Sequence, residues 1–148
     1  MSQIRFTVEE FENRFNDVSK AFGSPFHIDD IKIKIGKVQD VGMIKLNDHM
    51  AINLTIRKDG TVRDFVMIAQ GDGSQKSGYD ILLIIATLIA VTNPMLSEDG
   101  RANVLRGLGL NKRLPTDKVI HIEGDIRYTL SSSVGIGIMF TASDKDDN

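Results

Sequence analysis

The hydrophobic residues of this chain are most concentrated in one stretch near its middle. From Tyr79 to Asn93 the segment is almost entirely apolar, and from Ile81 to Val91 only Thr87 interrupts the apolar residues before Thr92 closes the run. The stretch follows a glycine-rich loop and stops at Pro94, so its length suits a helix, and the lack of a polar side predicts that this helix is buried. A bilayer needs about 20 apolar residues. The pattern therefore predicts a core helix and no transmembrane segment.

Two amphipathic helices are expected on either side of it. Thr7-Val8-Glu9-Glu10 has the Thr-x-x-Glu form of a capping box. The apolar stripe behind this box consists of Val8, Phe11, Phe15, Val18 and Phe22, and it ends at Gly23 and Pro25. Ser97 is the expected cap of a later helix that carries Ala102, Val104, Leu105 and Leu108 and closes at Gly107 and Gly109.

Alternation of apolar and polar residues predicts the strands. The alternating segments are Ile31–Ile35, Met50–Ile56, Val62–Ala69, Val119–Ile122, Ile126–Leu130 and Val134–Phe140, with a short strand expected around Met43–Leu46. Asp59-Gly60 is a tight-turn signal, and Gly124-Asp125 and Ser131-Ser132-Ser133 are the other expected turns. Each strand keeps one polar side, so one face of the sheet should meet solvent or a partner.

The element order predicts an α+β fold. We expect a mainly antiparallel sheet of about five to seven strands, with an N-terminal helix and two central helices packed on one face. A chain of 148 residues fits a single domain over 1–148, and the polar ends, 1–6 and 143–148, are expected to fray.

The apolar helix also raises the question of self-association. Its least apolar line runs through Asp80, Leu83, Thr87 and Ala90. That line either permits close helix packing inside one subunit or lies at a subunit boundary, and we expect the chain to form a homodimer because it has few other ways to cover such a helix.

Composition narrows the classes of partner. The net charge is −2 with both signs interspersed, so no nucleic-acid partner is expected. Small basic clusters occur at Lys32 and Lys34 and at Arg101, Arg106, Lys112 and Arg113, and we interpret them as solvated surface. There is no cysteine, which excludes disulfides. The start of the chain lacks the features of a secretion signal, which predicts a cytoplasmic protein, or a secreted or lipid-anchored one if a targeting segment has been removed.

Two glycine-rich segments invite comparison with nucleotide-binding loops. In Gly71–Gly78 the two glycines that a phosphate loop requires before Lys76 fall on Gln70 and Gln75. A glycine-containing turn followed by a helix cap at Ser77, with Asp80 three residues on, is the better interpretation. Gly135-Ile136-Gly137 lacks the third glycine of a dinucleotide fingerprint, and it favours a bulge or close packing in a strand.

The remaining polar residues assign no chemistry. The histidines are His27, His49 and His121, and only His121 shares a strand face with a nearby acid, Glu123. Asp72, Asp80 and Glu123 were considered as convergent acids, but nothing in the sequence selects them. We therefore predict no catalytic, cofactor-binding or metal-binding residues and no cofactor.

These observations favour a non-enzymatic protein-interaction module, chaperone-like or adaptor-like or inhibitor-like, that binds another protein or itself. The order of elements is similar, at that level alone, to the small chaperones that hold secretion substrates in extended form, although their closing helix has no counterpart here. A small immunity-type or phage-encoded inhibitor is an equivalent interpretation. The alternative is a small-molecule-binding or enzymatic pocket between helices and sheet near the 71–78 loop.

Overall fold

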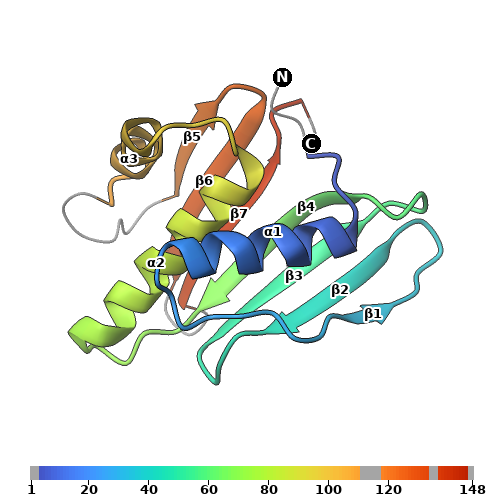
Figure 1. Cartoon of the computed structure of the whole chain (residues 1–148), viewed down its shortest axis with the longest axis horizontal. Coiled ribbons are helices and arrows are strands. Elements are labelled where there is room, and N and C mark those ends of the chain that lie inside the picture. Colours follow the sequence, from blue (N-terminus) through green and yellow to red (C-terminus); the bar gives the residue numbers. More distant parts are fainter. Residues whose placement is uncertain (1–3, 111–117, 134–136, 147–148) are drawn as a thin grey trace.

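The computed structural model describes residues 4–110, 118–133 and 137–146. They form a seven-stranded antiparallel sheet with three helices on one face (Figure 1), which confirms the predicted α+β class. The elements are α1 (Val8–Ala21), β1 (Lys32–Lys34), β2 (Asp40–Lys45), β3 (Met50–Ile56), β4 (Val62–Ala69), α2 (Gln75–Thr92), α3 (Glu98–Gly107), β5 (Val119–Glu123), β6 (Ile126–Ser133) and β7 (Gly137–Asp144).

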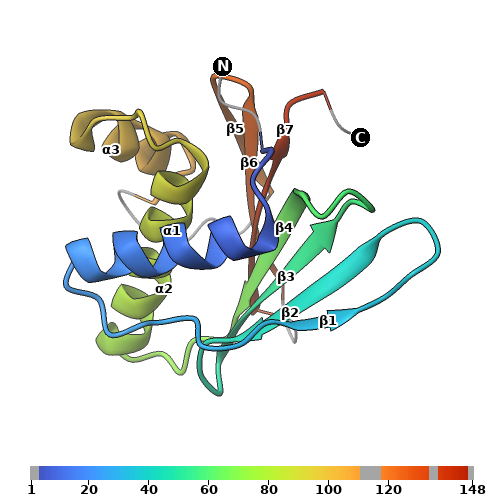
Figure 2. The ribbon, with the colours of Figure 1, turned by 45° about the vertical axis from the view of Figure 1, so that its right-hand side comes forward.

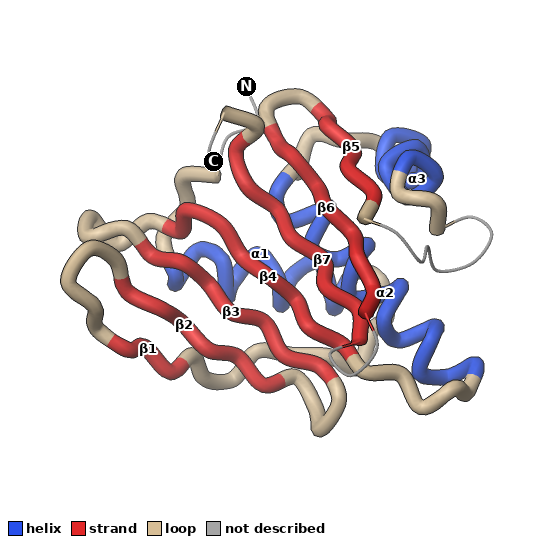
Figure 3. The backbone as a smooth tube through the Cα atoms, turned by 180° about the vertical axis from the view of Figure 1, so that it is seen from behind, coloured by secondary structure: helices blue, strands red, loops and turns tan. Residues whose placement is uncertain are grey.

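The strand order is β1-β2-β3-β4-β7-β6-β5. Two meanders, one before the central helices and one after them, therefore meet at the β4–β7 pair in the middle of the sheet. Figure 3 shows this pair from the side that carries no helix. Phe65 lies opposite Ala142 and Met67 opposite Phe140, so the junction is lined by core side chains.

Helix α1 begins as the capping box predicts. The Thr7 hydroxyl accepts from the Glu10 backbone N–H at 3.1 Å, and the Glu10 carboxylate accepts from the Thr7 N–H at 2.9 Å. Phe11 and Phe15 are fully buried, and the Phe11 ring lies 5.8 Å from the ring of Phe65 on β4. The predicted phenylalanine stripe thus joins α1 to the sheet through aromatic packing.

Helix α2 is the apolar core helix that the sequence predicts. Ile84, Ile85, Leu88 and Ile89 are inaccessible to solvent, and Thr87 and Ala90 are also buried within the one chain. By length and hydropathy α2 could cross a membrane, which corrects our expectation that the run is too short, but half of it is buried inside this fold. This burial favours the role of a core helix.

A buried polar cluster joins the end of α2 to the sheet. The Tyr128 hydroxyl lies 2.5 Å from the Thr92 hydroxyl and accepts from the Asn93 side-chain amide at 2.8 Å. Burial raises the pKa of Tyr128 to about 12, although both hydrogen bonds act in the opposite direction. The cluster satisfies three polar groups that would otherwise be unpaired in the core.

Several predicted boundaries were wrong. The cap of α2 is Ser74, whose hydroxyl accepts from the Ser77 N–H, so Ser77 lies inside the helix. Ser131–Ser133 continue β6 because they pair with β7, and Val134 falls outside the described residues. Ile33 and Ile35 are 50% and 73% exposed, since β1 is a three-residue edge strand.

The expectation of frayed ends also needs correction. Ile4 and Phe6 are buried, and the Ile4 N–H donates to Asp144 Oδ1 at 2.9 Å. Asp144 is itself only 8% exposed and forms an ion pair with Arg5 at 3.2 Å. A hydrogen-bonded acidic side chain therefore holds the two ends of the chain together.

The structure gives a reason for glycine at position 137, at the start of β7. Its φ is +98°, and a Cβ atom there would collide with the carbonyl oxygen of Ala69 on β4. The close packing that the sequence suggests is therefore present at Gly137, whereas Gly135 lies outside the described residues.

Candidate functional site

The most unusual surface of the molecule is the face of the sheet opposite the helices, called here the outer face. Figure 2 shows α1, α2 and α3 together on one side of the sheet, and Figure 3 shows the other side without a helix. Cross-strand pairing defines a continuous row across all seven strands of this face, which runs through Lys32, Met43, Asn53, Val66, Thr141, Thr129 and Ile120.

The outer face combines apolar side chains near its two edges with small polar ones in its middle. Val41 and Met43 on β2 are 36% and 42% exposed, and Ile120 and Ile122 on β5 are each 52% exposed. The middle of the row is Asn53, Thr141 and Thr129 with the apolar Val66 among them, and no aromatic residue lies among the paired positions of this face. Partly exposed aliphatic groups beside these short side chains form a surface that another backbone or side chain can approach closely.

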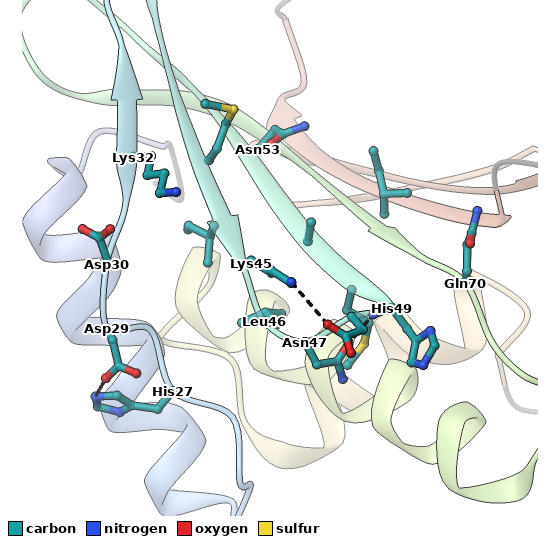
Figure 4. A pocket seen from close by; sticks show the side chains of 16 residues that line it. His27, Asp29, Asp30, Lys32, Lys45, Leu46, Asn47, His49, Asn53 and Gln70 are labelled. Carbon is teal, nitrogen blue, oxygen red and sulfur yellow. Dashed lines mark hydrogen bonds and ion pairs between the residues drawn. The ribbon is translucent and has the colours of Figure 1, made fainter.

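The larger hollow of this surface lies where β2 turns into β3 (Figure 4). It has a volume of about 850 Å³ and opens to solvent. Met43, Ala51 and Ile68 supply its apolar floor, while His27 and His49 lie at its rim. The hollow is thus formed by the outer face together with the connection that enters β1.

Charges around this hollow are paired at the surface. Lys45 Nζ lies 3.2 Å from Asp48 Oδ1, and His27 Nε2 lies 3.4 Å from Asp29 Oδ1, as the dashed lines in Figure 4 show. All four side chains are more than half exposed, so these pairs contribute little to stability. The rim therefore presents charged groups of both signs to solvent.

A second hollow, of about 590 Å³, lies near the opposite edge of the outer face. Ile120 and Ile122 line it together with Arg127 from the neighbouring strand β6 and Asp64 from β4. The outer face is therefore hollowed near both edges, and each hollow combines aliphatic groups with charged ones.

The loop at 71–78 forms a much smaller pocket, of about 120 Å³. The Ser74 N–H donates to Asp72 Oδ1 at 2.8 Å. Hydrogen bonds from the Ser74 side chain, the Ser74 N–H and the Ser77 hydroxyl lower the pKa of Asp72 to about 2. The Ser74 hydroxyl accepts a hydrogen bond from the Ser77 N–H at the start of α2. Side chains of the loop itself thus take up the donors that a phosphate would need. The turn is capped by a serine, but that serine is Ser74 and not the predicted Ser77.

The other candidates from the sequence do not converge on a reaction centre. His27 and His49 line the larger hollow, whereas His121 lies on β5 with its Nε2 3.2 Å from Glu123 Oε1. Asp72 and Asp80 line the small pocket without Glu123. Within residues 4–110, 118–133 and 137–146, no group of three or more histidine or acidic side chains is arranged to hold a metal ion. Lys112 and Arg113 lie outside the described residues.

Sequence reasoning found the polar sides of the strands but not these hollows. His27 and Asp29 line one hollow together with residues of β2 and β3, and this arrangement depends on strand order, for which a local pattern carries no signal. Comparison with protein-family models, with curated protein sequences and with solved structures found no match. Any functional proposal therefore depends on this α+β fold and its own surface.

Proposed function

We propose that this protein is a non-enzymatic interaction module that binds another protein through the outer face of its sheet. The observation that supports the proposal most strongly is that no helix of the described residues lies on that face, while partly exposed aliphatic groups lie on it from β2 to β5. Surfaces of this kind are typical of protein contact sites.

The charges support a polypeptide partner of mixed composition. Lys32, Lys34 and Lys45 lie along one side of the outer face, and Asp64 and Arg127 lie toward the other. Charges of both signs around aliphatic positions match a protein surface better than a polyanion.

The polar residues with shifted pKa values support a non-enzymatic role. Asp40, Asp59 and Asp72 have a lowered pKa because each accepts hydrogen bonds within its own turn or from a neighbouring lysine. Each of these aspartates has its own nearby hydrogen-bond donors, and the three aspartates lie at separate places in the fold. The pKa shifts therefore have structural causes and do not mark a shared reaction centre.

The test is capture of partners from the source cells with three versions of the full chain. Val66→Lys places a charge in the middle of the outer face, and Leu82→Lys is the matched control on the exposed side of α2. Proteins bound by the natural chain should be lost with Val66→Lys and kept with Leu82→Lys. Loss of the bound proteins with Leu82→Lys alone would place the binding surface on α2. Capture that neither substitution affects would contradict the proposal.

A second candidate function is small-molecule binding. The volume of about 850 Å³ at the β2–β3 turn lies within the range of small-ligand pockets, which is roughly 300–1,000 Å³. The pocket at the 71–78 loop is well below that range, which moves this alternative away from the loop. A compound that raises the melting temperature of the natural chain but not of an Ala51→Lys variant would support it.

A further inference from the structure

The two edges of the sheet differ in how they are protected. β1 has three residues, and two of them are Lys32 and Lys34. β5 has five residues, none of them lysine, arginine or proline, and its Ile120 and Ile122 are each 52% exposed. Because an edge strand presents free N–H and C=O groups, proteins commonly shorten edge strands or place lysine on them. β1 has both protections, and β5 has neither.

Helix α3 packs against the inner side of β5, and no described strand lies beyond it. His121 faces inward, where it pairs across the sheet with Tyr128 and contacts Gly107 at the end of α3 so closely that a Cβ atom there would collide with the ring. On the outer face Ile120 and Ile122 line the second hollow, which has a volume of about 590 Å³. β5 is the last strand in the sheet order, so no described strand pairs with its second side.

We infer that two copies of this chain pair antiparallel along their β5 edges around a two-fold axis. Such a pairing joins the two sheets and keeps both outer faces on the same side, since opposed residues share a face. In the register centred on His121, all five residues overlap, and Ile120 of each copy lies opposite Ile122 of the other. Four half-exposed isoleucines then cover one another.

Charge complementarity favours a second copy of the chain as the partner of the β5 edge. In this register each His121 lies diagonal to Glu123 of the second copy. The imidazole groups and carboxylates therefore alternate across the two-fold axis, at a separation that long side chains can span. The same two-fold operation on β1 would set Lys32 opposite Lys34 twice, and like charges in that position are unfavourable. The charged side chains therefore favour self-pairing along β5 and disfavour it along β1.

This inference does not depend on the proposed function, because pairing uses the backbone edge and leaves the middle of the outer face free. Sedimentation or light scattering of the full chain should show a mass that rises from 16.4 kDa toward twice that value over about a hundredfold increase in concentration. Ile122→Lys should weaken the dimer by about tenfold or more because the substitution enters the interface twice.

The matched control is Ile33→Lys on the other edge, where the natural side chain is 50% exposed. It should leave the mass unchanged, and unchanged melting curves should show that both variants fold. Hydrogen exchange supplies a second readout, because amides of residues 119–123 should be slower to exchange at high concentration than at low concentration.

A monomer at every concentration would overturn the inference, as would a dimer that Ile122→Lys leaves intact. Val66→Lys tells the two proposals apart, because it should abolish partner capture without changing the mass. If capture follows the proposed function while the chain stays monomeric, only the β5 pairing fails.

Discussion

Two neighbouring rows of the sheet, displaced by a single residue along each strand, have opposite characters. The inner row runs through Ile44, Ile52, Met67, Phe140, Leu130 and Val119, and all but the edge residue Val119 are buried. The outer row replaces them with Met43, Asn53, Val66, Thr141, Thr129 and Ile120. One row has side chains large enough to fill the space under three helices. The other row has partly exposed side chains, short ones in its middle, and no described helix covers it.

The difference shows which face stabilises the fold and which face is left for the proposed contact. Large side chains facing the helices stabilise the fold through burial. Small and partly exposed groups on the other face add little to stability, so they are free to serve a contact. The two faces should therefore respond in opposite ways to the same kind of substitution.

The largest effect is expected at α2. Leu88→Asp or Ile85→Asp should unfold the protein, because both side chains are fully buried and an unpaired charge costs more than the roughly 5–15 kcal/mol by which domains are stable. Leu82→Asp is the control on the same helix, where the side chain is 36% exposed, and it should keep a cooperative melt. An unchanged melt for Leu88→Asp would show that α2 is not in the core.

The two faces can next be compared at adjacent residues of β7. Phe140→Ala should lower the free energy of unfolding by about 3–5 kcal/mol, because it leaves a cavity beside Tyr128 and Phe65. Thr141→Ala, one position away on the outer face, should change it by less than about 0.5 kcal/mol. Denaturant titration measures both, and equal losses would remove the distinction between the faces.

A smaller effect is expected from the hydroxyl of Tyr128. Tyr128→Phe leaves Thr92 and Asn93 without a shared partner and should cost about 1–3 kcal/mol at neutral pH. Urea titration of both proteins at one pH measures this difference.

The same variant tests the pH dependence. The pKa of Tyr128 is about 12 in the fold against an ordinary 10.0, so the unfolded chain loses this proton first as pH rises. The stabilising contribution is therefore full below pH 10.0 and falls as pH rises toward 12. The natural protein should lose stability more steeply than Tyr128→Phe across that window, and parallel curves would contradict the assigned burial.

The smallest effect on stability is expected on the outer face itself. Val66→Lys should shift the free energy of unfolding by less than about 0.5 kcal/mol, since the side chain is partly exposed and no helix lies above it. A thermal melt checks this, and a loss comparable to that of Phe140→Ala would mean that the outer face is part of the core.

Local signals predicted much of the fold. The capping box at Thr7, the alternation in Met50–Ile56 and the turn at Asp59-Gly60 were read from neighbouring residues, and all three are present. Each is determined by contacts within a few positions, which explains why the sequence alone was enough.

Features that depend on distant pairing were not predicted. Ile33 and Ile35 alternate like core residues but lie on an edge, and Ser131–Ser133 resemble a turn but pair with β7. The burial of Ile4 depends on Asp144, 140 positions away. The unprotected β5 edge likewise follows from strand order, which no local pattern encodes.

Oxidative footprinting of the methionines tests most directly whether the outer face is the contact surface. In the purified chain Met43, which is 42% exposed, should oxidise much faster than the fully buried Met67 of the inner row, and Met95, which is 92% exposed near the helices, should also react quickly. When the chain is bound to its partner, Met43 should become protected while Met95 stays reactive. Protection of Met95 with Met43 still reactive would place the contact on the helical side and contradict the assignment.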